Sequence, residues 1–329
     1  MADEHVVGVG SSNQSSDKED ERVRLSLLDV RREQATLYDP KRRGFRCCRG
    51  FESRRSEPVA VFDHEEESTT RIARPLDTIP ESKRNFLALA LSVLYVKVLA
   101  SDVGFPISVF GTILMRDALD FKSIYLFKRD TDNCQVINSP DEMLILTGPD
   151  RGPFDATTFY FEINLKIKGD DETMDRIFSR TLVKEDYPLD QWSKREQVSS
   201  WLSTLELAYR SVHYAVEATV GIKIMKGPRE LLGSLTACST QESVEMVLYD
   251  SERWGASAVT ADGLVPLPRR LVVLREDEDL ILKVCVFGWG RKAKPKTTVL
   301  TIEHSDKSFH IKRGSYHLLV TVSWSGILR

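Results

Sequence analysis

The stretch that decides the fold runs from Phe110 to Lys168. Four apolar runs within it read FGTILMRD (110–117), IYLFKRDTDNCQVI (124–137), EMLILTGPDRG (142–152) and FYFEINLKIK (159–168). Each run is too short for a stable helix, and turn residues separate it from the next. This pattern is typical of antiparallel strands, and it predicts an all-β, antiparallel β-sandwich.

The strand pattern recurs at a fixed offset. Gly111 and Gly233 are 122 residues apart (233 − 111). The same offset relates further pairs of apolar residues: Phe127 and Tyr249, Phe159 and Ile281. Several matches in register with no gap indicate a duplication. A chance alignment of strands is the alternative, because strand patterns carry little information. We therefore predict two similar halves.

Composition divides the chain into a tail and a folded part. Residues 1–84 are rich in Ser, Asp, Glu and Arg and lack apolar periodicity, which predicts a largely disordered tail. The series of apolar, strand-like runs predicts a β domain over 85–327, with halves at about 85–200 and 201–327. Residues 173–197 are charged and weakly periodic, and we interpret them as a long connection with one helical turn.

Bulk properties exclude several classes of protein. The 329 residues carry a net charge of −3, so no global basic field gathers nucleic acid. Five cysteines without CxxC spacing argue against a disulfide framework or zinc site and favour a reducing compartment. The longest apolar stretch, 86–100, is shorter than the roughly 20 residues of a membrane span, so we predict no transmembrane segment. We expect an intracellular location, in the cytoplasm, the nucleus or both.

One segment of the tail is strongly basic. Residues 41–55 carry seven basic side chains and one Glu, a local charge of +6 (7 − 1). They form a candidate targeting or anion-binding patch: Lys41, Arg42, Arg43, Arg46, Arg49, Arg54 and Arg55. Such a cluster serves as a nuclear import signal or a patch for phosphate or anionic lipid. Cys47 and Cys48 within it are candidates for acylation. A solvated basic segment is the plainer alternative.

No catalytic constellation is present in the sequence. GxSxG, Walker and Rossmann patterns are absent. His310 and His317 are expected to face one another across a hairpin, but metal sites usually need three or four convergent ligands. Four carboxylates follow adjacent strands, where they either hold calcium or, as we favour, cap turns: Asp117, Asp120, Asp130 and Asp132. The loop RKAKPK (291–296) is interpreted as a solvated loop rather than a phosphate contact. We assign no catalytic residue, metal or cofactor.

Several segments together resemble a known family. They read VLASDVGFPISVFGTILMRD (98–117), LSTLELAYRSVHYAVEATVGIKI (202–224), DGLVPLPRRLVVL (262–274) and GSYHLLVTVSWS (314–325). The resemblance covers about residues 88–327. The family is an uncharacterised plant domain, expanded in grasses and also found C-terminal to the ribosome-inactivating domain of the large cereal jasmonate-induced protein. It implies a plant protein linked to stress or defence. It implies no catalytic residues, and about 80 polar residues cannot hold an rRNA N-glycosidase site.

Three functions remain open from the sequence. The first is a non-enzymatic β-sandwich module that binds a protein partner, because alternating strands come without an active-site motif. The second is a module associated with RNA or the ribosome, favoured by the basic clusters and the fusion partner. An unrecognised hydrolase is the least favoured. The partner and the oligomeric state are not specified by the sequence.

Overall fold

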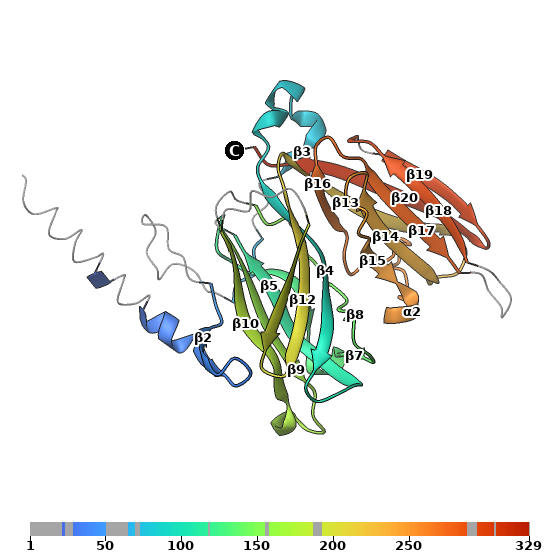
Figure 1. Cartoon of the computed structure of the whole chain (residues 1–329). Helices are drawn as coiled ribbons and strands as arrows, with labels where there is room; N and C mark the ends of the chain where they lie inside the picture. The colour runs from blue at the N-terminus through green and yellow to red at the C-terminus, as the bar shows by residue number, and fades with distance from the viewer. Residues whose placement is uncertain are drawn as a thin grey trace, which may run out of the picture.

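The structure, a computed structural model, describes residues 22–23, 29–50, 65–69, 73–117, 119–154, 158–186, 193–287, 295–305 and 307–328. Within this part, two antiparallel β-sandwiches lie side by side (Figure 1). The all-β prediction is confirmed. No helix among the described residues is long and apolar enough to cross a membrane.

The first sandwich contains two sheets with the strand orders β10-β9-β5-β6, with β7 also on β5, and β11-β12-β4-β8. Its strands are β4 (Ala90–Ser101), β5 (Ile107–Arg116), β6 (Ile124–Arg129), β7 (Gln135–Ile137), β8 (Glu142–Met143), β9 (Thr158–Ile167), β10 (Arg176–Asp186), β11 (Lys194–Ser200) and β12 (Ser203–Val212). Apolar side chains from both sheets, such as Phe127, Phe161 and Leu207, fill one core between them.

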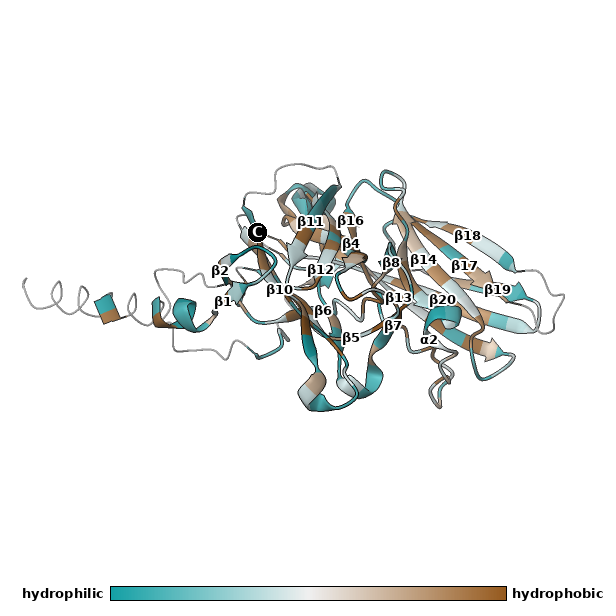
Figure 2. Cartoon of the chain, turned by 60° about the horizontal axis from the view of Figure 1, so that its bottom comes forward, coloured by the Kyte–Doolittle hydropathy of each residue, from teal (hydrophilic) through white to brown (hydrophobic). Residues whose placement is uncertain are grey.

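The second sandwich has the strand orders β16-β13-β20-β19, with β3 on β20, and β15-β14-β17-β18. Its strands are β13 (Ala215–Lys226), β14 (Gly233–Ser239), β15 (Met246–Asp250), β16 (Leu271–Arg275), β17 (Leu280–Val286), β18 (Lys296–Ile302), β19 (Lys307–Arg313), β20 (Tyr316–Gly326) and β3 (Arg74–Pro75). Figure 2 shows apolar and polar residues alternating along the strands, as expected for sheets with one buried face.

Short elements complete the fold. A separate hairpin is formed by β1 (Thr36–Asp39) and β2 (Gly44–Cys47). The short helices are η1 (Leu76–Thr78), η2 (Glu81–Phe86), η3 (Thr131–Asn133), η4 (Glu172–Met174) and α2 (Ser251–Trp254).

The two sandwiches share one topology. Strands β4, β5, β6, β8, β9, β10, β11 and β12 take the same places as β13, β14, β15, β16, β17, β18, β19 and β20, in the same chain order. Register agrees as well, because Ile113 pairs with Phe127 and Leu235 pairs with Tyr249, and a β-bulge follows each pair. The predicted duplication is therefore confirmed.

The two anchor glycines occupy equivalent, crowded positions. A Cβ at Gly111 would lie 2.3 Å from the carbonyl oxygen of Asn164, and one at Gly233 would lie 2.1 Å from that of Cys285. In both cases the crowding carbonyl precedes the residue that pairs with the glycine, Leu165 or Val286. Glycine is kept at both positions because the neighbouring backbone leaves no room for a side chain.

One predicted anchor was wrong by one residue. Ile113 pairs with Ile163, and its equivalent Leu235 pairs with Val284, so the offset between β9 and β17 is 121 (284 − 163). Phe159 therefore corresponds to Leu280, which is fully buried, and not to Ile281, which is only half-buried. A one-residue slip in a strand moves a side chain to the opposite face. The slip arises because Tyr249 and Val284 are 35 residues apart (284 − 249), whereas their counterparts Phe127 and Ile163 are 36 apart (163 − 127).

The boundary between the sandwiches also differs from the expected 201. β12 pairs with β4 in the first sandwich, so the chain passes to the second at residues 213–214. The second sandwich also takes residues that precede the first. β3 pairs with β20, and Leu76 and Ile79 are buried in the second core. The ordered part therefore begins before residue 85, and chain segments flanking the first sandwich close the second.

Residues 173–197 are not the long connection that we expected. They contain η4 and two strands, β10 and most of β11. Both are edge-side strands with alternating charged residues such as Arg180, Lys184 and Glu196. Charged side chains are typical of sheet edges, and they weakened the apolar signal that the prediction relied on. The equivalent edge strand of the second half, β18, was also missed, because threonines interrupt the apolar pattern of its sequence KTTVLTI.

Candidate functional site

The basic cluster predicted from the sequence folds, in its described part, into the hairpin β1–β2. Asp39 and Pro40 start the turn, and the Asp39 carboxylate accepts hydrogen bonds from the backbone amides of Lys41 and Arg42 at 2.9 and 3.1 Å. Arg43 adopts a positive φ of 52° before Gly44. Asp is favoured at the start of a turn because its carboxylate accepts hydrogen bonds from nearby backbone amides, and Pro is favoured because its ring fixes φ. Local sequence thus builds the hairpin directly.

An aromatic pair projects from this hairpin. Tyr38 and Phe45 face one another across the two strands, with ring centroids 5.5 Å apart and edge-to-face geometry. Tyr38 is 49% exposed and Phe45 is 73% exposed. Cross-strand aromatic pairs stabilise a hairpin by about 0.2–1 kcal/mol. That gain does not require such exposure, so the pair leaves a rigid apolar surface open to solvent.

The predicted basic residues have different environments. Lys41 forms a salt bridge to Asp102 at 2.9 Å, and Arg49 forms one to Glu65. Arg42 donates through Nε to the Ser199 carbonyl at 2.5 Å. Arg43 and Arg46 are exposed and make no side-chain hydrogen bond or salt bridge among the described residues. The remaining two predicted residues, Arg54 and Arg55, lie outside the described residues. Two guanidinium groups therefore accompany the aromatic pair without a partner in the described part of the chain.

Several contacts fix the hairpin to the first sandwich. The buried Asp39 also accepts a hydrogen bond from the Trp201 amide at 3.1 Å. Burial would raise the pKa of Asp39, but the amides of Arg42 and Trp201 outweigh it and hold the pKa below its usual value. The Gly50 amide donates to Glu162 of β9 at 2.8 Å. The hairpin is therefore a fixed projection, although it belongs to the segment predicted as tail.

The two cysteines of the hairpin differ in accessibility. Cys48 is buried, and burial raises the pKa of its thiol. Cys47 is half-buried, and its Sγ lies 3.2 Å from the Arg49 carbonyl oxygen. A buried thiol with a raised pKa is a poor nucleophile, so Cys48 is not suited to acylation in this conformation.

The first sandwich contains two buried sets of ion pairs, and one of them, Arg116–Glu162, adjoins the hairpin through the Gly50 amide. Arg116 forms two hydrogen bonds to Glu162, at 2.6 and 3.2 Å, with the Arg side chain 1% exposed. Arg151 pairs with Asp117 at 2.5 Å and with Asp120 at 3.2 Å. Burial lowers the pKa of Arg151, but Asp117 outweighs it and raises that pKa. These charges are paired with one another, which is a structural arrangement rather than a reactive one.

Turn capping explains two of the four carboxylates considered for calcium, whereas Asp130 makes no side-chain capping hydrogen bond at η3. Asp117 accepts hydrogen bonds from the amides of Leu119 and Phe154, and Asp120 accepts one from Lys122. Both cap turns, as favoured from the sequence. The described residues contain no group of three or more His, Cys, Asp or Glu side chains suited to a metal ion.

The two histidines do meet across their hairpin, with 3.0 Å between Nδ1 of His310 and Nε2 of His317. This confirms the expected juxtaposition. Of the loop RKAKPK, residues 291–294 lie outside the described residues, so the structure does not place its basic cluster.

Sequence reasoning missed the aromatic pair as a functional feature. The signals were present, since Asp39-Pro40 and Gly44 bracket a turn between TLY and FRC. The surrounding charge concealed them, because seven basic residues over 41–55 were interpreted as tail composition.

Solved structures similar to the chain include the C2A- and C2B-domains of extended synaptotagmin 2, at 8% identity over 82% of this chain and 99% of that chain, with a TM-score of 0.25. Human GIVD cytosolic phospholipase A2 in complex with methyl gamma-linolenyl fluorophosphonate matches at 13% identity over 72% of this chain and 32% of that chain, with a TM-score of 0.22. Such low TM-scores carry no argument about function.

Sequence comparison identifies a family but no activity. No curated protein is significantly similar to the chain. The family model described as a domain of unknown function, DUF6598, matches residues 90–322, which include nearly all of both sandwiches. The chain therefore belongs to the DUF6598 family.

Proposed function

We propose that the chain is a non-enzymatic interaction module, and that the hairpin β1–β2 is its contact surface for an acidic protein partner. The exposed pair Tyr38 and Phe45, on the same hairpin as the exposed Arg43 and Arg46, carries this proposal. Tyr, Phe and Arg are enriched in protein interfaces, where rigid aromatic side chains bury area at a low entropy cost. The two guanidinium groups favour a partner surface that bears carboxylates.

The buried charges support a role without catalysis. Arg116, Arg151 and their carboxylate partners are paired and sequestered. Glu162, the partner of Arg116, also accepts a hydrogen bond from the Gly50 amide next to the hairpin. The family resemblance adds the proposal of a plant protein acting in stress or defence, located in the cytoplasm or nucleus. Association with RNA or the ribosome is the second candidate, favoured by the same two arginines.

A pull-down from cells compares the wild-type chain with Phe45→Ala and with the double variant Arg43→Gln/Arg46→Gln. Phe86→Ala is the matched aromatic control, since Phe86 is 58% exposed but lies in η2. We expect both hairpin variants to lose the same partner protein, and the control to retain it. Equal retention by all variants would refute the proposal.

The RNA candidate predicts a different result. RNase treatment would then remove the captured material, and binding would fall steeply with salt, because phosphate contacts release counterions. In that case Arg43→Gln/Arg46→Gln would make the slope of the logarithm of the binding constant against the logarithm of salt concentration shallower by about 2. For a protein partner, RNase has no effect, and Phe45→Ala costs about as much affinity as the arginine variant.

A further inference from the structure

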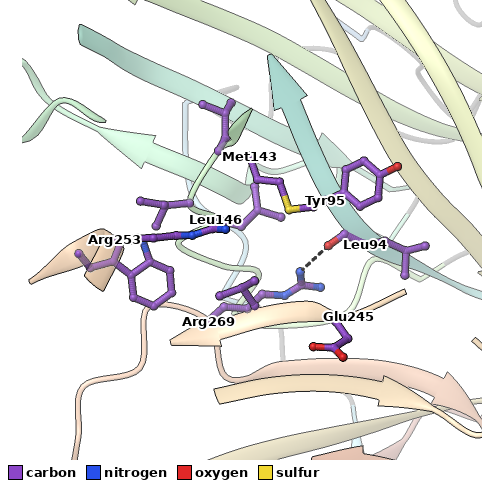
Figure 3. Close-up of a pocket in the computed structure, with 11 residues that line it drawn as sticks. Leu94, Tyr95, Met143, Leu146, Glu245, Arg253 and Arg269 are labelled. Atoms are coloured by element: carbon purple, nitrogen blue, oxygen red, sulfur yellow. Dashed lines mark hydrogen bonds between the residues drawn. The ribbon is translucent and has the colours of Figure 1, made fainter. Parts of the chain in front are cut away.

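A small crevice lies between the two sandwiches (Figure 3). β4 and the residues around β8 line it from the first sandwich, and β15, α2 and Arg269 line it from the second. The space inside it that the centre of a water-sized sphere can reach is about 20 Å³. That is room for one or two water-sized particles and too little for an organic ligand.

Arg269 extends into this seam with almost no exposure, at 3%. Its guanidinium donates to the carbonyl oxygens of Val93 at 2.5 Å and Leu94 at 3.3 Å, and its Nη2 lies 3.4 Å from the sulfur of Met246. Figure 3 shows the side chain turned toward the Leu94 carbonyl. All of these partners are neutral. Among the described residues, no carboxylate pairs with Arg269.

Two residues that line the crevice each carry a buried donor that has no acceptor among the described residues. Arg269 Nε is one, and the indole Nε1 of Trp254 is the other. Both residues line the crevice. The nearest acidic lining residue, Glu245, is engaged elsewhere, with Lys283 and at 2.8 Å with Thr236. Arg253, which also lines the crevice, adds a second positive charge there, although it lies 3.3 Å from Asp250.

A buried charge of this kind needs compensation. Burial lowers the pKa of Arg269 to about 10, so the guanidinium remains charged at neutral pH. Removing an unpaired ion from water is strongly unfavourable, and buried donors without acceptors add to the cost. One acceptor that carries a negative charge relieves both. A carboxylate or phosphate exceeds the volume of the crevice, whereas a monatomic anion fits.

We propose that the crevice binds a single halide ion, which would be chloride in the cell, through Arg269 Nε–H and Trp254 Nε1–H. The ion neutralises the buried guanidinium. Both of its donors belong to the second sandwich, but neutralising Arg269 also supports the hydrogen bonds from this guanidinium to the β4 carbonyls of the first sandwich. Halide binding therefore stabilises the mutual orientation of the two sandwiches. This site is independent of the hairpin β1–β2.

Thermal unfolding of the full chain tests the proposal. The midpoint is measured while sodium gluconate is replaced by sodium chloride or bromide at constant ionic strength. We expect a saturable rise with either halide, because a ligand that binds only the folded state stabilises it by mass action. Trp254→Phe should weaken the apparent halide affinity about tenfold to a hundredfold, the worth of one hydrogen bond to a charged group. Arg269→Met should abolish the halide response.

Arg270→Gln is the matched control, since Arg270 is adjacent but has a side chain 47% exposed. It should keep the full halide response. If Arg269→Met does not fold, anomalous diffraction from wild-type crystals grown in bromide decides the question. A bromide peak beside Arg269 Nε supports the proposal. Water alone in the crevice, or an equal response of wild type to gluconate and chloride, would overturn it.

Discussion

The buried pair Arg210–Glu278 should contribute strongly to the association of the two sandwiches. Arg210 lies in β12 of the first sandwich, and Glu278 lies in the turn before β17 of the second. Two hydrogen bonds join them, one of 2.9 Å between Nη1 and Oε1 and a second between Nη2 and Oε2. Their side chains are only 8% and 2% exposed. Replacing one member should therefore leave the other charged, buried and unpaired.

Glu278→Gln should lower the free energy of unfolding by about 3–5 kcal/mol, the cost of breaking a buried pair. For a unit of 150–250 residues, each kcal/mol shifts Tm by about 2–4 °C, so the loss should be roughly 6–20 °C. The double variant Arg210→Met/Glu278→Leu should recover most of this loss, because no charge then remains buried. Urea unfolding of the wild type, Arg210→Met, Glu278→Leu and the double variant forms the required cycle.

An exposed pair provides the control. Arg270 and Asp150 also join the sandwiches, but their side chains are 47% and 65% exposed. Asp150→Asn should therefore change stability by less than about 1 kcal/mol. If Glu278→Gln costs no more than Asp150→Asn, or if the double variant is as unstable as Glu278→Gln, the buried pair does not act as argued.

The pH dependence should follow the sign of the Glu278 shift. Burial raises the pKa of Glu278, but hydrogen bonding and charge attraction from Arg210 outweigh it and lower the pKa below 4.5. A depressed carboxyl pKa contributes stability above the unfolded value of 4.5 and loses it as pH falls through the folded value. The difference between wild type and Glu278→Gln should be constant near neutral pH and shrink below about pH 4.5.

Three further predictions concern the core, the duplication and the hairpin. Leu76→Ala should lower the free energy of unfolding in urea by about 2–5 kcal/mol, because Leu76 is 1% exposed in the second core. An unchanged free energy would show that the segment containing Leu76 does not close the second sandwich. Gly233→Ala should cost about 1–3 kcal/mol by crowding a carbonyl, and Gly111→Ala should cost more, because Gly111 also has a positive φ of 111°. Gly44→Ala, whose nearest contact is 3.9 Å, should be tolerated. A loss at either anchor no larger than at Gly44 would argue against this crowding. Asp39→Asn should increase proteolysis of the hairpin at neutral pH. The wild type should reach the same rate of cleavage only below pH 3.8, because the lowered pKa of Asp39 keeps its carboxylate charged above that value. Identical cleavage of both proteins at neutral pH would contradict this.

Strand alternation was enough to predict the sandwich and its duplication. The register error at Ile281 shows the limit of that signal. When both faces of a strand carry apolar side chains, two registers that differ by one residue give similar patterns. β10 and β11 were missed because charged edge strands lack a continuous apolar face. The closure of the second sandwich by Leu76 was invisible, since it depends on a contact with residues more than 100 positions away.

The candidate site was predicted only in part. The basic residues from Lys41 to Arg49 were identified by charge, but charge alone does not reveal which guanidinium groups are already paired. Lys41 binds Asp102 while Arg43 has no side-chain partner in the described part of the chain, and this difference depends on how the hairpin docks. The crevice was wholly unpredictable, because Trp254 and Arg269 meet β4 only after the two sandwiches associate.

The most direct test of the proposed function places a photocrosslinker on the hairpin. Phe45→p-benzoylphenylalanine retains an aromatic side chain at a position that is 73% exposed. Val299→p-benzoylphenylalanine, at 57% exposure on β18 of the second sandwich, is the control. Irradiation in cells followed by mass spectrometry should give one protein adduct at position 45 that is absent at position 299. Adducts that are the same at both positions, or RNA as the product at position 45, would contradict the account.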